Sequence, residues 1–358
     1  MEICVVKPLP WFTKGIWWLC FLAFPAQAAF TSLYVFGDGV CTTTNGPGNS
    51  TNYFGKRYTN GRVWIEVLSQ RQGLAYNASN NWSYFGHYSS NMLANVGRFS
   101  PPPDGNSALF VVWVNDADFV WNVDYYGTNL ALWSKAMNQS LTNHYKAITN
   151  LFYAKGARTL IMPNAVDLSQ VPYYSGLPAG ETSFIRQRIV DYNASFVLMS
   201  NQATAALPGL TIHVPDLFTL LDEVLAQPPV YGLINPGVDA LFDTALKDKS
   251  LDGPGASYVF WDYLNPSAKT HAVMADLVQQ MIAPVLISQL TSLGASNRLD
   301  LGNVPIGRNG AVLGSDDLLN WADVQGIDST NLTQTAFVPA AGSRQFYRLR
   351  FPFAWSWP

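Results

Sequence analysis

The sequence has few cysteines. Only three occur in 358 residues, and two of them, Cys4 and Cys20, fall within the first 28 residues. A chain that keeps Cys41 alone cannot form an internal disulfide and offers no cysteine cluster for a zinc site. A phosphate-binding glycine loop is also missing from the sequence. We therefore expect stability to come from a packed core, with no metal and no cofactor.

Charge is also scarce. Charged residues make up 13% of the chain, the formal net charge is −3, and no run of Lys and Arg exceeds two residues. Proteins that bind nucleic acid usually carry basic patches, so the sequence excludes that class of partner. Hydrophobic residues make up 48%, which is enough to build a real core and excludes wholesale disorder.

No apolar run near the N-terminus is long enough to span a bilayer. Residues 15–24 form an apolar stretch, about half of the roughly 20 residues that a span requires. Lys7 and Lys14 precede it, and Pro25-Ala-Gln-Ala28 follows it as a small-x-small cleavage pattern. This order predicts a cleaved signal peptide over residues 1–28 and a secreted, periplasmic or cell-surface protein. A membrane anchor is the alternative.

From residue 33 onward, short apolar runs alternate with amphipathic segments of helical length. The apolar runs are typical of strands buried on both faces of a parallel sheet, and they cover residues 33–37, 108–114, 158–163, 210–214 and 257–260. Helical spacing of apolar residues predicts helices over 128–154, 181–206, 217–226 and 267–293, with Gly156 as the C-cap of the first. Regular alternation implies right-handed crossovers, so we expect a three-layer α/β/α domain over residues 29–292.

The last 60 residues have a different character. Helical periodicity stops near residue 297, and short runs separated by Gly, Asn, Asp and Ser predict strands near residues 311–314, 321–324, 335–338 and 346–350. The sequence therefore predicts a small all-β C-terminal module over residues 297–358. Adhesion, sorting and packing against the main domain all remain open as its role.

Five polar blocks follow one another in a recognisable order. They are Phe36-Gly-Asp-Gly39, Asn60-Gly-Arg-Val-Trp64, Asn81-Trp-Ser-Tyr-Phe-Gly86, Trp113-Val-Asn-Asp116 and Phe260-Trp-Asp-Tyr-Leu-Asn-Pro266. Their order and spacing over residues 33–285 resemble the GDSL/SGNH hydrolases, also called GDSL-like lipases/acylhydrolases. The resemblance implies a flavodoxin-like SGNH-hydrolase fold with a parallel sheet. It also implies hydrolysis of carboxylic esters by a Ser-His-Asp triad.

The resemblance assigns roles to five positions, and two of these lack the family's residue. Gly39 occupies the nucleophile position, where relatives have serine, and Asn265 occupies the base position, where they have histidine. Asp262 matches the triad acid, and Gly86 and Asn115 match the oxyanion donors. Glycine has no side chain to attack with, and an asparagine amide does not titrate near neutral pH. Efficient serine-type hydrolysis is therefore not expected.

Further residues are candidates for the same site. Asp38 and His87 are adjacent to matching positions, Trp113 lies two residues before Asn115, and all three are candidates to line the cleft. Cys41 is a conceivable substitute nucleophile and His271 a conceivable substitute base, although a packed cysteine and a structural histidine are the simpler interpretations.

Three functions stay open from the sequence. The first is a secreted GDSL/SGNH-type protein, catalytically impaired, that binds a small-molecule ester, lipid or glycan. The second is an active ester hydrolase with a non-standard site. The third is a non-catalytic surface or interaction protein that acts through its β tail. The sequence does not indicate an oligomeric state.

Overall fold

The computed structural model describes residues 5–6, 30–47, 51–114, 116–340 and 345–351. Most of the predicted signal peptide lies outside these residues. Its described part is the short strand β1 (Val5–Val6), which pairs with residues 346–347 near the C-terminus. Among the helices of the described residues, none combines the length and the apolar character that crossing a membrane requires.

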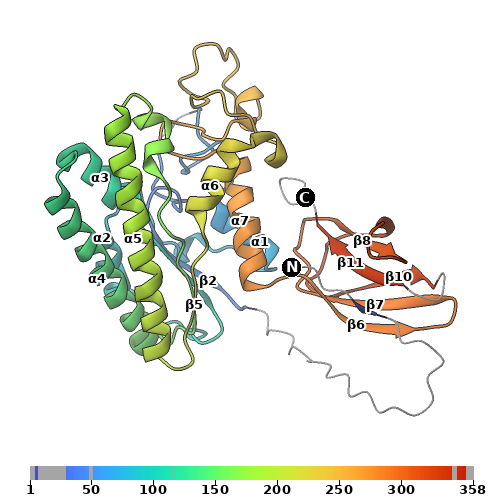
Figure 1. Cartoon of the computed structure of the whole chain (residues 1–358). Helices are drawn as coiled ribbons and strands as arrows, with labels where there is room; N and C mark the ends of the chain where they lie inside the picture. Colours follow the sequence, from blue (N-terminus) through green and yellow to red (C-terminus); the bar gives the residue numbers. More distant parts are fainter. Residues whose placement is uncertain (1–4, 7–29, 48–50, 115, 341–344, 352–358) are drawn as a thin grey trace.

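A parallel sheet forms the centre of the larger part of the molecule (Figure 1). Its strands run in the order β2 (Leu33–Gly37), β3 (Leu109–Trp113), β4 (Thr159–Ile161) and β5 (Thr211–His213). Every residue of β2 and β3 is buried, as the continuous apolar runs predict. On the free side of β2, Asn81 adds a single parallel bridge to Val35. This bridge stands where a flavodoxin-like order places its second strand.

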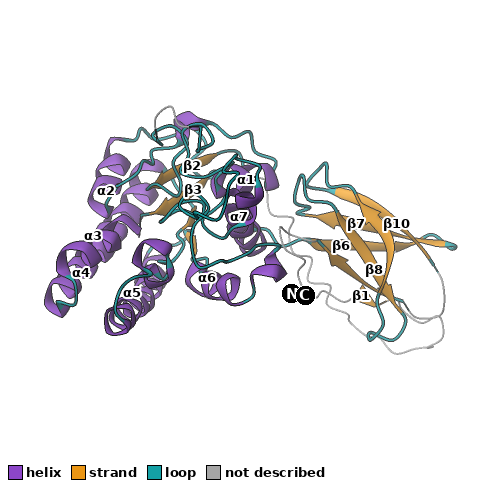
Figure 2. Ribbon diagram, turned by 90° about the horizontal axis from the view of Figure 1, so that it is seen from above, coloured by secondary structure: helices purple, strands orange, loops and turns teal. Residues whose placement is uncertain are grey.

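Helices cover both faces of this sheet (Figure 2). On one side lie α2, α4 and α5, and on the other lie α1 and α7, with α6 beside α7. The α-helices are α1 (Trp64–Arg71), α2 (Ser89–Arg98), α3 (Asp116–Tyr126), α4 (Leu130–Lys155), α5 (Ala179–Ala206), α6 (Leu217–Ala226) and α7 (Ala268–Ile282). The predicted three-layer α/β/α architecture is confirmed.

Short 3-10 helices connect the main elements. They are η1 (Ala78–Asn80), η2 (Leu168–Gln170), η3 (Pro172–Tyr174), η4 (Pro228–Tyr231) and η5 (Pro254–Ser257). Residues 257–260 therefore do not form the fifth strand that their apolar run predicts. Ser257 ends η5, Tyr258 and Phe260 make isolated bridges to Ile234 and Pro266, and the parallel sheet ends at β5.

The helix expected over residues 267–293 is shorter than its apolar pattern predicts. It ends at Ile282, because Pro284 has no N–H to continue the backbone ladder. Residues 286–292 instead form a strand, β6, that pairs with β7. The expectation that the helix continues through these residues was wrong, since an apolar run of this length does not by itself distinguish helix from strand. The division of the chain into domains remains a prediction.

The C-terminal part consists of two antiparallel sheets, which stand beside α1 and α7 (Figures 1 and 2). The sheet orders are β1-β11-β8-β9 and β10-β7-β6. The strands are β6 (Leu286–Ser292), β7 (Ser296–Gly302), β8 (Gly310–Ser315), β9 (Ala322–Ile327), β10 (Gln334–Pro339) and β11 (Phe346–Arg350). Buried side chains come from both sheets and include Leu299, Val312, Val338 and Tyr347.

A buried carboxylate joins the two parts. Asp276 of α7 is fully buried, and it accepts hydrogen bonds from Arg71 of α1 at 2.8 Å and from Arg308 at 3.2 Å. The Arg71 guanidinium also donates to the carbonyl of Ile306 at 3.1 Å. Since Ile306 and Arg308 follow β7, this network fixes the β part against α1 and α7.

Candidate functional site

A cleft of about 240 Å³ opens at the carboxyl ends of β2 and β3. It brings together residues from three of the five sequence blocks: Asp38 and Gly39 of the first block, Gly86 of the third, and Asn265 of the fifth. Reactive groups of parallel α/β sheets gather at this edge, because the strand ends and their loops converge there. Gly39 and Asn265 thus line the same cleft.

Gly39 lies in the turn that follows β2, and an aromatic ring occupies the space beside it. A Cβ atom placed on Gly39 would come within 2.8 Å of the Cδ2 atom of Phe85. The φ angle of Gly39 is not positive, so the turn itself does not require glycine. The glycine instead lets the Phe85 ring lie where a nucleophile side chain would begin. Asp38 stabilises the same turn by accepting the N–H of Val40 at 3.2 Å.

Asn265 is held by Asp262 in a fixed orientation. The Asn265 Nδ2 donates to both carboxylate oxygens of Asp262, at 2.9 and 3.1 Å. An ionised carboxylate can only accept, so the amide must turn its nitrogen toward Asp262 and keep its oxygen as an acceptor. A base histidine would use one ring nitrogen for the same bond and present the other to the substrate. Asn265 thus reproduces the orientation of a base without its proton chemistry.

Asp262 is buried and heavily hydrogen-bonded. Its oxygens also accept the backbone N–H of Leu264 at 2.9 Å, the backbone N–H of Asn265 at 2.8 Å and the hydroxyl of Tyr53 at 3.0 Å. Burial raises the pKa of Asp262, and these hydrogen bonds oppose that rise. Sequence reasoning missed Tyr53, which comes from the loop before the second block and carries no recognisable motif.

Gly86 and Asn115 are the two expected oxyanion positions. Gly86 lines the cleft and has a φ angle of +77°. Only glycine adopts that backbone conformation at little cost, which explains the residue at this position. Asn115 lies outside the described residues.

Three of the other candidates are placed away from the cleft. His87 does not line it: the ring is buried, and its Nδ1 lies 3.1 Å from the carbonyl oxygen of Gly37. Burial lowers the pKa of His87 to about 4. His271 is also buried, accepts the N–H of Trp64 at 3.3 Å and has a pKa lowered by burial to about 3. Cys41 is buried in the core beside Gly37. None of the three is placed to act as a nucleophile or base here.

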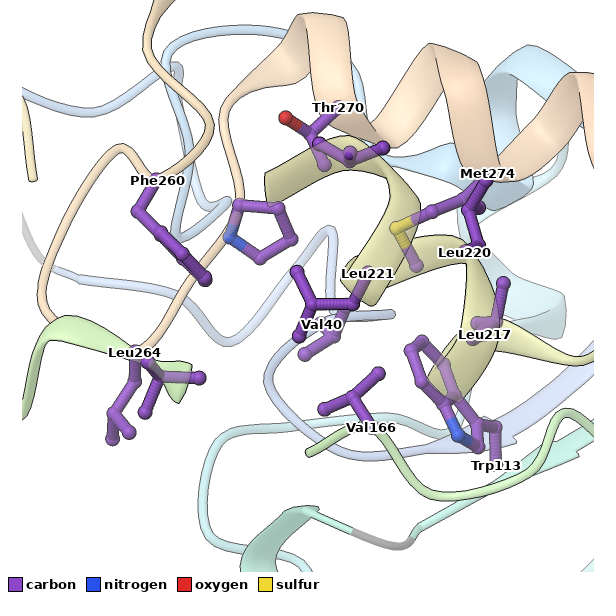
Figure 3. Close-up of a pocket in the computed structure, with 13 residues that line it drawn as sticks. Val40, Trp113, Val166, Leu217, Leu220, Leu221, Phe260, Leu264, Thr270 and Met274 are labelled. Carbon is purple, nitrogen blue, oxygen red and sulfur yellow. The ribbon is translucent and has the colours of Figure 1, made fainter. Parts of the chain in front are cut away.

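Trp113 lines a second pocket next to the cleft. This pocket of about 50 Å³ is lined almost entirely by apolar side chains (Figure 3). Val40 and Leu264 line both hollows, so the two pockets are neighbours. The expectation that Trp113 lines the cleft is corrected: its indole faces the apolar pocket and donates to the carbonyl of Asn164 at 3.2 Å.

Aromatic side chains form the outer wall of the cleft. None of them belongs to the five sequence blocks. Trp121 and Tyr125 stack on α3 with ring centroids 3.9 Å apart, and Tyr88 meets Trp121 edge-on at 5.8 Å. Asp124, on the same helix, lines the cleft and accepts the hydroxyl of Tyr174 at 3.0 Å. In the sequence, the spacing of Trp121 and Tyr125 by four residues indicates that the two rings lie next to each other, because residues four apart share one helix face.

No group of three or more His, Cys, Asp or Glu residues that could hold a metal ion occurs within the described part of the chain. Gly39 and Asn265 leave the cleft without a side-chain nucleophile and a titratable base at the positions that match the triad. The groups in the cleft can form hydrogen bonds and can pack against an apolar or aromatic surface.

A family model and a curated relative both connect the chain with the GDSL lipases. The model of the family GDSL-like Lipase/Acylhydrolase matches residues 33–278. A thermolabile hemolysin of Vibrio parahaemolyticus is 20% identical over 242 residues, which span 64% of this chain and 56% of the hemolysin. A GDSL esterase/lipase of Arabidopsis thaliana is 21% identical over 244 residues, which span 63% of this chain and 67% of the plant protein. The chain thus matches little more than half of the hemolysin.

Solved structures similar to the chain include a lipase and an esterase. A lipase from a goat rumen metagenome is 11% identical, with a TM-score of 0.43, and the match covers 70% of this chain and 97% of the lipase. An acetylxylan esterase of Geobacillus stearothermophilus is 12% identical, with a TM-score of 0.41, and the match covers 71% of this chain and 94% of the esterase.

Proposed function

Because the chain belongs to the GDSL-like lipase/acylhydrolase family, we propose that it is a secreted member that binds ester, lipid or glycan ligands without hydrolysing them efficiently. The observation that carries the proposal is the state of the nucleophile position. Gly39 provides no hydroxyl, and the ring of Phe85 occupies the space into which one would project.

The family's chemistry explains why this loss is severe. A serine attacks the ester carbonyl, a histidine takes the serine proton, and an aspartate orients the histidine. In another serine hydrolase, removing the serine or the histidine alone costs about 10⁶ in turnover, nearly as much as removing the whole triad. This chain lacks both at the matching positions, Gly39 and Asn265.

The remaining parts of the site favour binding. In our proposal the backbone N–H groups of Gly39 and Gly86, which both line the cleft, receive the carbonyl oxygen of an ester. Each such donor is typically worth about 10²–10³ in rate in an active enzyme, and it also binds the ground-state carbonyl. The Asn265 oxygen, held in place by Asp262, would accept a hydroxyl or N–H of the ligand.

The ligand class and the location rest on different grounds. The relatives are described as a hemolysin and as an esterase/lipase, which supports an ester or lipid ligand for the shared region. Export is proposed from the charged, apolar and small-residue order of residues 1–28.

The direct test measures binding and turnover on the same chain. We expect p-nitrophenyl butyrate to bind, as followed by calorimetry, while release of p-nitrophenol stays at the level of a heat-denatured control. Ala117→Phe places a ring in the cleft and should abolish binding, because Ala117 lines it. The matched variant Ala322→Phe, at an exposed position of β9, should leave binding unchanged.

Rapid release of p-nitrophenol by the unaltered chain would overturn the proposal and favour an active hydrolase with a non-standard site. Binding that survives Ala117→Phe but is lost in Ala322→Phe would favour the alternative in which the β tail carries the function.

A further inference from the structure

A second hollow adjoins the cleft and shares two aromatic rings with it. Tyr88 and Trp121 line both spaces, and their ring centroids lie 5.8 Å apart. The hollow has a volume of about 380 Å³ and lies between the start of α2, the length of α3 and the first half of α4. No residue of the five sequence blocks is among the described residues that line it, so the family motifs do not account for it.

The hollow is lined by polar side chains that are deeply buried. Ser89, Asn122, Ser140 and Asn143 all line it, and each is at most 5% exposed. Most of these groups have partners: the Asn143 amide donates to the Ser89 hydroxyl at 3.0 Å, and the Ser140 hydroxyl lies 3.2 Å from that of Tyr192. Such pairing is expected, because buried polar groups are nearly always hydrogen-bonded.

Asn122 is the exception among these side chains. It is only 3% exposed, yet its amide makes no hydrogen bond with any residue that the structure describes. Asp118 lies four residues before it and Tyr126 four residues after it, so the three share the face of α3 that lines the hollow. A buried amide without a partner costs free energy, and a group that enters the hollow and hydrogen-bonds to it would recover that cost.

The charges and hydrogen-bonding groups of the hollow select the chemistry of such a group. The charged side chains among its described lining residues are Asp118 and Lys135, which have opposite signs, so neither an anion nor a cation is favoured. The Asn122 amide and the serine hydroxyls can both donate and accept hydrogen bonds. A neutral ligand with several hydroxyl groups matches them, because each hydroxyl also does both.

The aromatic rings add a requirement for apolar surface. Trp121 is 40% exposed and Tyr126 is partly exposed at the same hollow. Ring faces carry negative electrostatic potential, which attracts the slightly positive C–H groups of a saturated ring. A sugar ring has hydroxyl groups around its edge and C–H groups on its faces, so it meets both requirements at once.

We propose that this hollow binds a neutral pyranose unit of a glycan, with Asn122 as the central hydrogen-bonding group and the rings of Trp121 and Tyr126 as apolar contact surface. The volume of about 380 Å³ lies within the roughly 300–1,000 Å³ of small-molecule pockets. Because the hollow is separate from the cleft that Gly39 and Asn265 line, the inference goes beyond the proposed function and does not depend on it.

The test titrates the full chain with sugars and follows binding by saturation-transfer NMR and calorimetry. The probes are the methyl glycosides of glucose, galactose, mannose, xylose and N-acetylglucosamine, with sorbitol as a control that has the hydroxyl groups but no ring. We expect at least one glycoside to bind with a Kd of about 1–10 mM. Sorbitol should bind at least about tenfold more weakly, because an open chain has no ring face and loses more conformational freedom.

Reciprocal substitutions locate the site. Ala136→Trp fills the hollow and should abolish glycoside binding, whereas Ala117→Phe fills the cleft and should leave it unchanged. Asn122→Leu keeps the size of the side chain and should weaken binding by at least about fivefold. Its melting temperature should be unchanged or higher, because an apolar group of similar shape replaces an unpartnered polar one. The matched control Asn138→Leu, at an exposed position of α4, should change neither quantity.

Several results would overturn the inference. They are no binding of any glycoside, sorbitol binding as tightly as the glycosides, and binding that both Ala136→Trp and Asn122→Leu leave unchanged. Binding that Ala117→Phe abolishes and Ala136→Trp preserves would place the sugar in the cleft instead. A clear fall in the melting temperature of Asn122→Leu would show that the amide stabilises the fold and would remove its assignment to a ligand. Binding of p-nitrophenyl butyrate to Ala136→Trp tests the proposed function separately.

Discussion

At the scale of single residues, Gly39 and Phe85 are coupled by one short contact. The backbone at Gly39 accepts any residue, but a Cβ there would come within 2.8 Å of the Phe85 ring. Because Phe85 is 42% exposed, its ring can rotate outward when it is displaced. The position of the Phe85 ring therefore favours glycine at residue 39, whereas the backbone conformation there does not require it.

This coupling predicts non-additive stability. Gly39→Ala should lower the free energy of unfolding by about 1 kcal/mol, since it forces the ring to move. In a Phe85→Ala background the same substitution should cost close to nothing. A double-mutant cycle from urea unfolding measures the coupling. Two fully additive substitutions would show that the ring does not respond to the nucleophile position.

Two buried histidines predict a dependence of stability on pH. The pKa values of His87 and His271 are lowered to about 4 and about 3 by burial, below the value of about 6.5 for an unfolded chain. The unfolded state therefore binds more protons, and stability is complete above pH 6.5 and falls as the pH drops toward 4. Each pKa unit of difference corresponds to about 1.4 kcal/mol.

The melting temperature measured between pH 7 and pH 5 tests this expectation in a range where most carboxylates stay ionised. NMR titration should show the ring signals of His87 and His271 unchanged down to about pH 5. A titration of either ring near pH 6.5 in the folded protein would contradict the assignment.

The inner half of the site could be predicted from the sequence, and the outer half could not. Gly39, Gly86 and Asn265 lie in blocks with fixed order and spacing, and they meet in one cleft. Trp121 and Asp124 lie on a helix without a motif, and their place depends on how α3 packs beside Tyr88 and Ser89 at the start of α2. His87 is next to Gly86 in sequence but is buried, because adjacent residues in a turn point in different directions.

At the scale of secondary structure, local signals were reliable where they agreed with packing. Helix α6 covers the predicted residues 217–226, and α4 ends at Gly156 in the left-handed conformation, with φ of +78°. The apolar run over residues 257–260 instead pairs with loop segments. Residues 286–292 alternate poorly, and their strand pairing with β7 depends on distant partners that a local pattern does not contain.

The C-cap of α4 gives a prediction with a matched control. Gly156→Ala should lower the free energy of unfolding by about 1 kcal/mol, because a side chain is disfavoured in the left-handed region. Gly97→Ala lies within α2, has no positive φ and has open space around its Cβ. That control should raise stability by about 0.5–1 kcal/mol. Equal effects of the two substitutions would contradict the cap assignment.

At the scale of the whole molecule, the β part and the α/β part share one buried ionic network. Asp276 is fully buried between Arg71 and Arg308, and the latter comes from the β part. Removing one partner of a buried network leaves charge uncompensated, which is far more costly than removing a surface pair.

Asp276→Ala should therefore destabilise the protein by about 3–5 kcal/mol. The control Asp323→Ala breaks the exposed pair with Arg350 and should cost no more than about 1 kcal/mol. Chemical denaturation followed by tryptophan fluorescence measures both. A small effect at Asp276 would show that the two parts are held together by other contacts.

The central claim is that a family cleft persists here without its nucleophile and base. Its most direct test restores the serine and the histidine in a chain that lacks the Phe85 ring. The triple variant is Phe85→Ala, Gly39→Ser and Asn265→His. Release of p-nitrophenol should exceed that of the matched Phe85→Ala, Asn265→His control by about 10²-fold or more. Hydrolysis by the unaltered chain as fast as by the restored one would contradict the claim, as would a folded restored chain with no hydrolysis at all.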